Sequence, residues 1–270
     1  MIKQNLHTHS IYCDGKNTLE EMTEAAIKSG FSSIGFSGHC YTPFDNSYCM
    51  SLQNTNKYCT EIDELKEKYK NKIKIYKGIE YDLYSEYDTS GFDYIIGSVH
   101  YILKDGKYID VDLSAESVSA AIKKYFDGDE MAYVRAYFNE IIKVPDQTGC
   151  DILGHFDLVS KFCEKSPAFD TKGEEYMNCA LEAVNCVSKK IKVFEVNTGA
   201  MSRGYRTLPY PSVEIIRAMK KSGMMPVVTS DCHNKEHIDY GFDVAYRLLR
   251  NAGYTTALIF DEGKFVEYPV

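Results

Sequence analysis

The chain has 270 residues, of which 44% are hydrophobic and 26% charged, with a formal net charge of −8 and a pI near 5.4. This composition is typical of a globular protein large enough to bury one substantial core. The acidic balance argues against nonspecific nucleic-acid binding, which needs a basic face. No run approaches the roughly 20 apolar residues that span a bilayer.

The N-terminal segment has the pattern of a strand followed by a helix. Ile2 and Leu6 are the apolar positions of the first candidate strand, and Gly15 breaks that pattern. Residues 17–28, NTLEEMTEAAIK, have the cap and the apolar spacing of an amphipathic helix. The first ten residues lack the apolar core of a signal peptide, so we expect a cytoplasmic protein.

Apolar or β-branched runs then alternate with helical patterns along the chain. The further candidate strands are residues 32–39, 72–82, 93–100, 150–157, 192–197, 225–231 and 255–261. The helical stretches between them include residues 53–71, 114–126, 174–190 and 212–223. This alternation is typical of repeated βα units. No linker-like segment interrupts it, so it predicts a single α/β domain over residues 1–270.

A closed or nearly closed barrel fits these eight strands better than two domains, with one strand at an edge or outside the barrel. An open doubly wound sheet is the alternative, although no G-x-G-x-x-G follows the first strand. Nine cysteines are scattered without any C-x-x-C pair, which indicates reduced thiols.

Six of the seven histidines fall at the C-terminal ends of candidate strands, and carboxylates occupy comparable places. These positions are His7, His9, His39, His100, His155 and His233, together with Asp14, Glu80 and Asp231. In a parallel α/β barrel all strand C-termini open onto one face. Any one of these residues alone could be a cap or an ion-pair partner. Independent placement would not select the same residue types repeatedly, because the 31 lysines and arginines avoid these places.

Imidazole and carboxylate donors suit zinc, manganese or iron in a catalytic site. Nine candidate ligands are too many for one ion, so we expect two or three metals with a bridging carboxylate. Cys13, Cys40 and Cys232 adjoin ligands but are expected to pack rather than bind metal, and His237 is expected to be exposed. Such a cluster favours phosphate-ester hydrolysis by a bridging hydroxide, while amide or deaminase chemistry remains open on the donors alone.

The motifs HTHSIYCDG, SGHC, GIEYD, GSVHYI, GHFDLV and SDCH, in this order, resemble the polymerase and histidinol phosphatase (PHP) superfamily over nearly the whole chain. EVNTGAMSRGYRTLPYPSVEIIRAMKKSG and the chain length are similar to its stand-alone histidinol-phosphate phosphatases. The resemblance implies a distorted (β/α)7 TIM-like barrel. It also implies hydrolysis of L-histidinol phosphate to L-histidinol and phosphate, late in histidine biosynthesis.

The resemblance further implies three metal sites and a phosphate ligand. The three sets are His7, His9, Glu80 and Asp231; Glu80, His100 and His155; and Asp14, His39 and His233. Some relatives have histidine at the position of Asp14. Arg203 is the implied phosphate ligand, with Arg206 and Lys161 as weaker candidates. Asp231, His233 or a water on the third metal would protonate the leaving oxygen.

Two rival functions stay open. The first is another phosphoesterase of the same superfamily, acting on phosphotyrosine, a nucleotide or a sugar phosphate. The second is a noncatalytic metal-binding module, which the retention of nearly every candidate ligand disfavours. We expect a small-molecule phosphate monoester as the partner, with no nucleic acid and no membrane, and the sequence predicts no oligomeric state.

Overall fold

A single parallel sheet of seven strands forms the centre of the protein. The computed structural model describes residues 3–270, so Ile2 of the first candidate strand lies outside the described residues. The strands of the sheet, in spatial order, are β1 (Gln4–Asn5), β2 (Ser33–Phe36), β3 (Lys74–Asp82), β4 (Tyr94–Ser98), β7 (Ile152–Leu153), β8 (Val193–Asn197) and β9 (Met225–Thr229). Every neighbouring pair is parallel, as repeated βα units require.

The two edges of this sheet meet just beyond β1 and β9, so the sheet is a nearly closed barrel. Thr8 and Cys232 form a parallel bridge, and the His9 amide donates to the Cys232 carbonyl at 3.0 Å. The expected distorted seven-stranded α/β barrel is therefore confirmed, and the open-sheet alternative is wrong.

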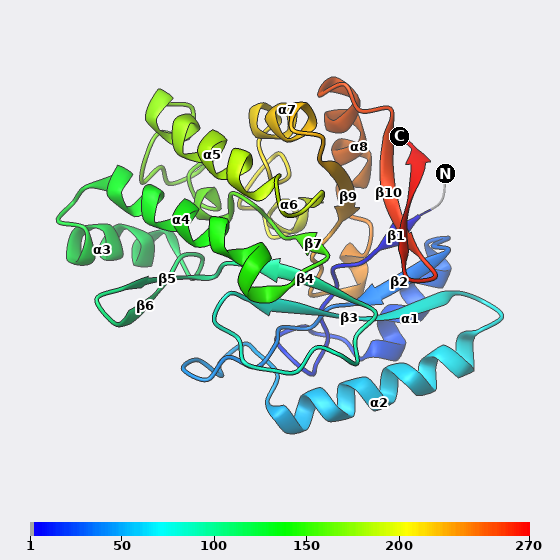
Figure 1. Cartoon of the computed structure of the whole chain (residues 1–270). Helices are drawn as coiled ribbons and strands as arrows, with labels where there is room; N and C mark the ends of the chain where they lie inside the picture. Colours follow the sequence, from blue (N-terminus) through cyan, green and yellow to red (C-terminus); the bar gives the residue numbers. More distant parts are fainter. Residues whose placement is uncertain (1–2) are drawn as a thin grey trace.

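The helices surround the barrel on the outside (Figure 1). They are α1 (Leu19–Lys28), α2 (Leu52–Tyr69), α3 (Ala115–Tyr125), α4 (Glu130–Thr148), α5 (Glu174–Val187), α6 (Gly199–Ser202), α7 (Val213–Lys221) and α8 (Phe242–Asn251). The expected helix at residues 17–28 begins as its sequence predicts. The Thr18 hydroxyl accepts from the Glu21 amide, and the Glu21 side chain accepts from the Thr18 amide. No helix among residues 3–270 is both long enough and apolar enough to cross a membrane.

Two antiparallel hairpins lie outside the barrel. They are formed by β5 (Tyr101–Lys104) with β6 (Lys107–Asp110), and by β10 (Thr256–Asp261) with β11 (Lys264–Pro269). The candidate strand at residues 255–261 is thus the one that does not belong to the barrel. In Figure 1 its hairpin lies beside β1, near both chain ends.

Two candidate strands are much shorter than their apolar patterns indicate. The first reduces to Gln4–Asn5 and the fifth to Ile152–Leu153. The Asn5 side chain accepts from the His7 amide at 3.1 Å and donates to Ser230 at 2.6 Å. The Asn5 side chain takes up the His7 amide, so His7 and His9 follow the strand, and beyond it the pairing continues as the bridge between Thr8 and Cys232.

A small apolar cluster fills the interior of the barrel near the N-terminal ends of its strands. Its buried members are Leu6, Tyr76, Tyr94, Ile96, Ile152, Val193, Val227 and Phe260. The Tyr94 ring crosses the interior because Gly35 and Gly78 leave space: a Cβ on either would lie within 2.2 Å of Tyr94 atoms. A larger cluster packs the outer sheet face against the helices.

The β10–β11 hairpin closes the N-terminal end of the barrel. The Gln4 side chain donates to the Phe260 carbonyl at 2.7 Å and accepts from its amide at 2.6 Å. The Phe260 ring, 3% exposed, contacts Tyr76 and Tyr94 with ring centroids 5.1 and 5.6 Å apart. The opposite end of the barrel is therefore left for the functional site.

Replacing Phe260 by alanine is expected to lower the free energy of unfolding by about 3–5 kcal/mol, since it leaves a cavity beneath Tyr94. Urea denaturation of the two proteins measures the difference. Val266→Ala in the same hairpin is the matched control, because Val266 is 47% exposed. Equal decreases in the free energy of unfolding of the two variants would contradict the inference that Phe260 stabilises the closed end of the barrel.

Candidate metal centre

All nine candidate ligands converge beyond the C-terminal ends of the barrel strands. His7, His9 and Asp14 follow β1, His39 follows β2, Glu80 lies in β3, His100 follows β4, His155 follows β7, and Asp231 and His233 follow β9. Three overlapping groups among them have donor atoms within 4.8 Å of one another. The structure thus brings together side chains up to 226 positions apart in the chain (233 − 7).

Glu80 is the centre of the cluster and is only 1% exposed. Its Oε1 accepts from the Ser98 hydroxyl at 2.7 Å. Five imidazole nitrogens lie close to its two oxygens: His155 at 2.8 Å, His39 at 2.9 Å, His7 at 3.1 Å, His100 at 3.5 Å and His9 at 3.6 Å. His155 and His100 face Oε1, whereas His7, His9 and His39 face Oε2. A carboxylate that has imidazole nitrogens near each of its two oxygens is suited to bind two metal ions, one through each oxygen.

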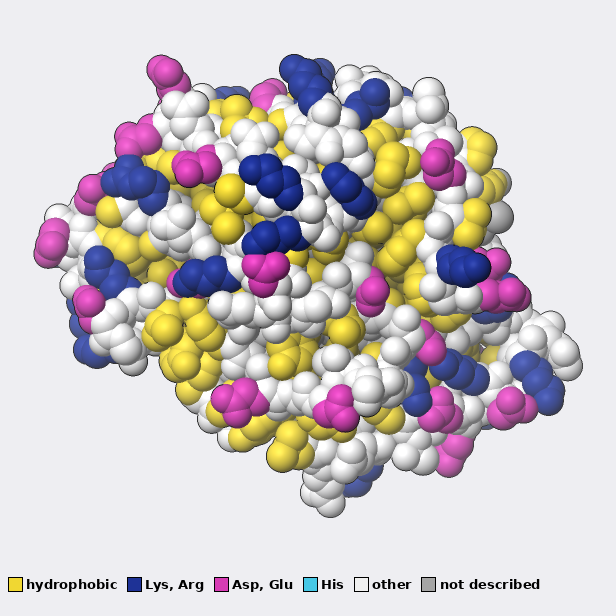
Figure 2. Space-filling view, viewed as in Figure 1, with side chains coloured by type: hydrophobic (Ala, Val, Ile, Leu, Met, Phe, Trp, Pro, Cys, Tyr) yellow, Lys and Arg dark blue, Asp and Glu magenta, His cyan; other side chains and the backbone are white. Residues whose placement is uncertain are grey.

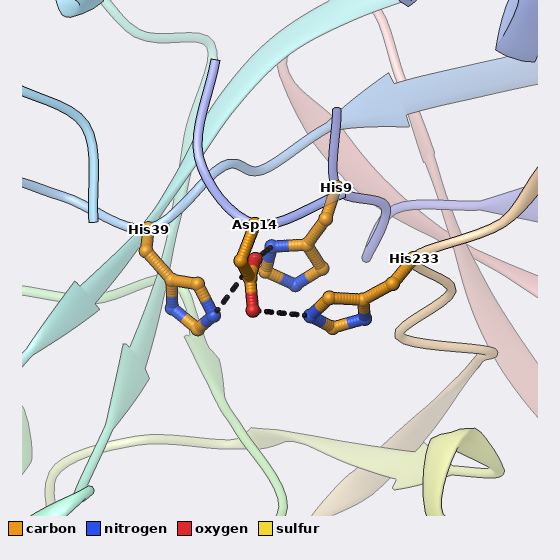
Figure 3. A group of neighbouring side chains, drawn as sticks. All are labelled: His9, Asp14, His39 and His233. Atoms are coloured by element: carbon orange, nitrogen blue, oxygen red, sulfur yellow. Dashed lines mark ion pairs between the residues drawn. The ribbon is translucent and has the colours of Figure 1, made fainter. Parts of the chain in front are cut away.

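Asp14 joins a second part of the cluster, shown in Figure 3. Its Oδ2 lies 3.1 Å from His233 Nε2, and its Oδ1 lies 3.7 Å from both His39 Nε2 and His9 Nδ1. The His9 and His233 rings stack with centroids 4.0 Å apart. The Asp14, His39 and His233 set implied by the family resemblance is therefore assembled, with His9 beside it.

Asp231 connects the histidines to an arginine. Its Oδ1 lies 3.2 Å from His9 Nε2, and its Oδ2 lies 3.2 Å from Arg203 Nη2. Arg203 Nη1 also donates to the Asp231 carbonyl and lies 3.1 Å from His233 Nδ1. Asp231 has φ = 43°, a left-handed conformation that a non-glycine residue adopts only when its surroundings hold it there.

The donor set fits divalent metal ions. His7 Nε2, His9 Nε2 and Glu80 Oε2 are buried and lack a hydrogen-bond partner within residues 3–270. Buried polar atoms are nearly always paired, so unpaired atoms that point at one another need a shared partner. Imidazole nitrogen and carboxylate oxygen without thiolate match a catalytic zinc, manganese or iron site.

The close packing of ionisable side chains in the cluster shifts their pKa values. Burial, together with the neighbouring His233 and His39, lowers the pKa of His9 to about 3. Burial also acts to lower the pKa of His7, but Glu195 and Glu80 raise it well above its usual value. Burial opposes ionisation of Glu80, yet the His7 and His39 rings hold its pKa well below the ordinary range. Glu80 is thus ionised and available to cations.

Lys161 and Arg206, the weaker candidates for phosphate binding, are engaged with other groups. Lys161 Nζ lies 2.8 Å from Asp112 Oδ2 and donates to the Asp112 carbonyl at 2.9 Å. The Arg206 guanidinium donates to the Ser160 hydroxyl at 2.5 Å and covers the Tyr210 ring at 4.5 Å. Within residues 3–270, Arg203 alone of the three donates hydrogen bonds to a residue of the cluster. The phosphate-binding role of each stays a prediction.

The three cysteines next to the ligands pack against the core as expected, and His237 differs from expectation. Cys40 and Cys232 are buried, and Cys13 is partly buried with its Sγ 3.5 Å from His9 Nδ1. His237 is half-buried beside Tyr240, with ring centroids 5.6 Å apart, so its expected exposure is wrong.

Two carboxylates that support the cluster were not among the candidate residues. Glu195 Oε1 lies 2.6 Å from His7 Nδ1, and Asp82 Oδ2 lies 3.2 Å from His100 Nδ1. A partner of this kind orients a ligating imidazole. Glu195 interrupts the apolar run KVFEVN, and Asp82 ends GIEYD two residues after Glu80; charged residues at these positions were the available signal.

Gly199 allows Asp231 and Arg203 to meet. A Cβ there would lie 2.8 Å from Asp231 Oδ2 and 3.0 Å from Arg203 Nη2. We therefore expect Gly199→Ala to lower kcat/KM for a phosphomonoester about tenfold or more, since a displacement near 1 Å is costly in an active site. Gly91→Ala is the control, because the space around Gly91 is open. Unchanged kinetics in Gly199→Ala would show that this packing is not needed.

A family model described as PHP domain matches residues 5–199, which is more than half of the chain. The chain belongs to the PHP domain family. The matched span includes every candidate ligand except Asp231 and His233, and those two lie in the same cluster by contact with His9 and Asp14.

Two relatives that align over most of the chain are named as histidinol-phosphatases. A Bacillus subtilis histidinol-phosphatase is 25% identical over 265 residues, covering 90% of this chain and 98% of that protein. A Schizosaccharomyces pombe protein named probable histidinol-phosphatase is 25% identical over 288 residues, covering 95% and 89%. The structure of a Lactococcus lactis histidinol phosphate phosphatase, complexed with zinc, L-histidinol and phosphate, matches with a TM-score of 0.70. It is 19% identical and covers 98% of both chains, so it supports the fold.

Proposed function

We propose that this PHP-family protein is a metal-dependent phosphatase that hydrolyses L-histidinol phosphate to L-histidinol and phosphate in histidine biosynthesis. The observation that carries the proposal is Glu80, whose two oxygens face five imidazole rings at the open end of the barrel. The shared name of relatives that align over most of the chain supports the substrate. The single-domain extent over residues 1–270 and the cytoplasmic location stay predictions.

The proposed metal ligands form three sets that share Glu80 between the first two. They are His7, His9, Glu80 and Asp231; Glu80, His100 and His155; and Asp14, His39 and His233. Zinc, manganese and iron all suit these donors. When bound, divalent ions would supply a nucleophile from water at neutral pH and neutralise charge on the phosphate oxygens.

The protein side chains orient the substrate and supply a proton. Arg203 can turn its guanidinium toward phosphate oxygens, which it binds with charge-assisted hydrogen bonds. Its contacts with Asp231 and His233 keep it at the edge of the cluster. We assign protonation of the leaving alkoxide to Asp231 or His233, since both lie beside Arg203. Burial of His7, His9 and Glu80 keeps bulk water away from the reacting groups.

Metal analysis of the purified protein, combined with turnover of a substrate panel, tests the proposal. We expect at least two divalent ions per chain and a strong preference for histidinol phosphate over p-nitrophenyl phosphate and nucleotides. A chelator should abolish turnover, and added zinc or manganese should restore it. Preference for another phosphomonoester would assign a different substrate within the family, and no turnover of any phosphoester would favour a noncatalytic module.

On the face of the molecule shown in Figure 2, acidic and basic side chains are interspersed.

A further inference from the structure

Glu195 is a carboxylate buried in the wall of the barrel, with 0% exposure, in the middle of β8. Its Oε1 lies 2.6 Å from His7 Nδ1 and accepts from the Thr229 hydroxyl at 2.5 Å. Its Oε2 accepts from the His155 backbone amide at 2.8 Å and from the Asn197 side-chain amide at 2.9 Å. A carboxylate has about four acceptor sites, so Glu195 has a partner for each.

The contact with His7 decides which ring nitrogen of His7 is free. With Glu195 at Nδ1, a proton is held on that nitrogen, and Nε2, which lies 3.1 Å from Glu80 Oε2 and 3.7 Å from Asp231 Oδ1, is the nitrogen that would bind a metal. Nε2 is the buried atom of this ring without a hydrogen-bond partner in the described chain. Glu195 therefore prepares His7 as a ligand of the first proposed metal set.

The contact with His155 acts on the other side of Glu80. β7 has only two residues and one paired register position with β8, Leu153 with Phe194. Beyond that pair, the His155 amide is held by the Glu195 carboxylate instead of by the strand ladder. The His155 ring then reaches Glu80 Oε1 at 2.8 Å, as part of the second proposed metal set.

We propose that Glu195 is a positioning residue that couples the first two metal sites, because one rigid carboxylate holds His7 and the backbone of His155 together. This inference rests on the metal ligands of the proposed function. A buried charge is costly unless it is paired, and the contacts of Glu195 with His7, Thr229, Asn197 and the His155 amide offset that cost. Glu195 thus fixes the separation of ligands on the two oxygens of Glu80.

Asp82 provides a natural comparison because it acts on one site only. Its Oδ2 accepts from the His100 amide at 2.8 Å and lies 3.2 Å from His100 Nδ1. His100 belongs to the second proposed set alone. Loss of the Asp82 carboxylate should therefore weaken one metal, whereas loss of the Glu195 carboxylate should weaken two.

Zinc titration of the metal-free full-length protein against a competing chelator tests this difference. In Glu195→Gln the amide NH2 faces groups that are themselves donors, so we expect affinity for two zinc equivalents to fall about 10- to 100-fold. In Asp82→Asn we expect a comparable loss for one equivalent. The visible absorption of the cobalt-substituted proteins should change at two sites in Glu195→Gln and at one in Asp82→Asn.

The outcomes separate this inference from the proposed function. Wild-type protein that binds no zinc contradicts the proposed function itself. Wild-type binding with unchanged affinities in Glu195→Gln overturns only the coupling role, as does a loss of metal-free stability without any loss of zinc affinity. If Glu195→Gln does not fold, Thr229→Val removes one hydrogen bond to the same carboxylate. That variant should weaken the same two equivalents to a smaller extent, and an effect confined to one would overturn the coupling.

Discussion

The Glu80→Gln protein is expected to lose at least about 10³-fold in kcat/KM for histidinol phosphate and to retain fewer metal ions, while remaining folded. Each oxygen of Glu80 faces a different set of imidazoles, and an amide nitrogen cannot replace a carboxylate oxygen as a ligand. If Glu80 holds the metal ions as proposed, loss of its carboxylate would remove several kcal/mol of charge stabilisation in the transition state, which corresponds to a factor of this size. Steady-state kinetics and elemental analysis measure the two effects.

Glu140→Gln is the matched control for this substitution. Glu140 is also buried, at 4% exposure, but it pairs with Lys143 on α4 at 2.6 Å. We expect that variant to keep its metals and its activity. Normal hydrolysis by the Glu80→Gln protein after its metals are stripped would refute the mechanism.

Arg203→Ala is expected to lower kcat/KM by about 10²- to 10³-fold. The Arg203 side chain is 28% exposed, so a substrate can reach it, and its Nη2 already lies 3.2 Å from Asp231 Oδ2. Hydrogen bonds from an ionised donor contribute about 1.5–3 kcal/mol each, so two of them account for the factor. Arg203→Lys keeps the charge but loses the planar fork, and we expect it to be intermediate.

Arg247→Ala controls for the loss of one positive charge, since Arg247 is 60% exposed and pairs with Asp243 on α8. Its kinetics should match those of the wild type. If Arg203→Ala were fully active and Arg206→Ala were not, the phosphate-binding role would pass to Arg206, although Arg206 now covers the Tyr210 ring.

The positions of the ligands could be predicted because strand ends in a parallel barrel face one side. Glu80 follows a long apolar run, and Asp231 and His233 lie in SDCH at the end of the run MPVVTSD. All three lie in the cluster, as that rule requires. The apolar pattern placed His7 and His9 at the end of the first candidate strand, and both follow a strand of only two residues. Their ring centroids are 5.1 Å apart, and the bridge between Thr8 and Cys232 holds this segment against the chain that follows β9.

The strand at residues 255–261 shows the limit of local pattern. Its apolar run resembles a barrel strand, but β11 pairs with it and the two Gln4 hydrogen bonds place it beneath the barrel. Periodicity indicates which positions of a segment are buried, but it does not indicate which other segment they contact.

The chemical identity of the donors and their order along strand ends followed from the sequence by itself, because these depend on residue type and on βα alternation. The tertiary structure alone decided which atoms meet: that Glu80 divides its oxygens between two groups of histidines, and that Glu195 holds both His7 and His155. Such contacts join residues between 40 and 188 positions apart, and they depend on barrel closure and side-chain packing that no local pattern records.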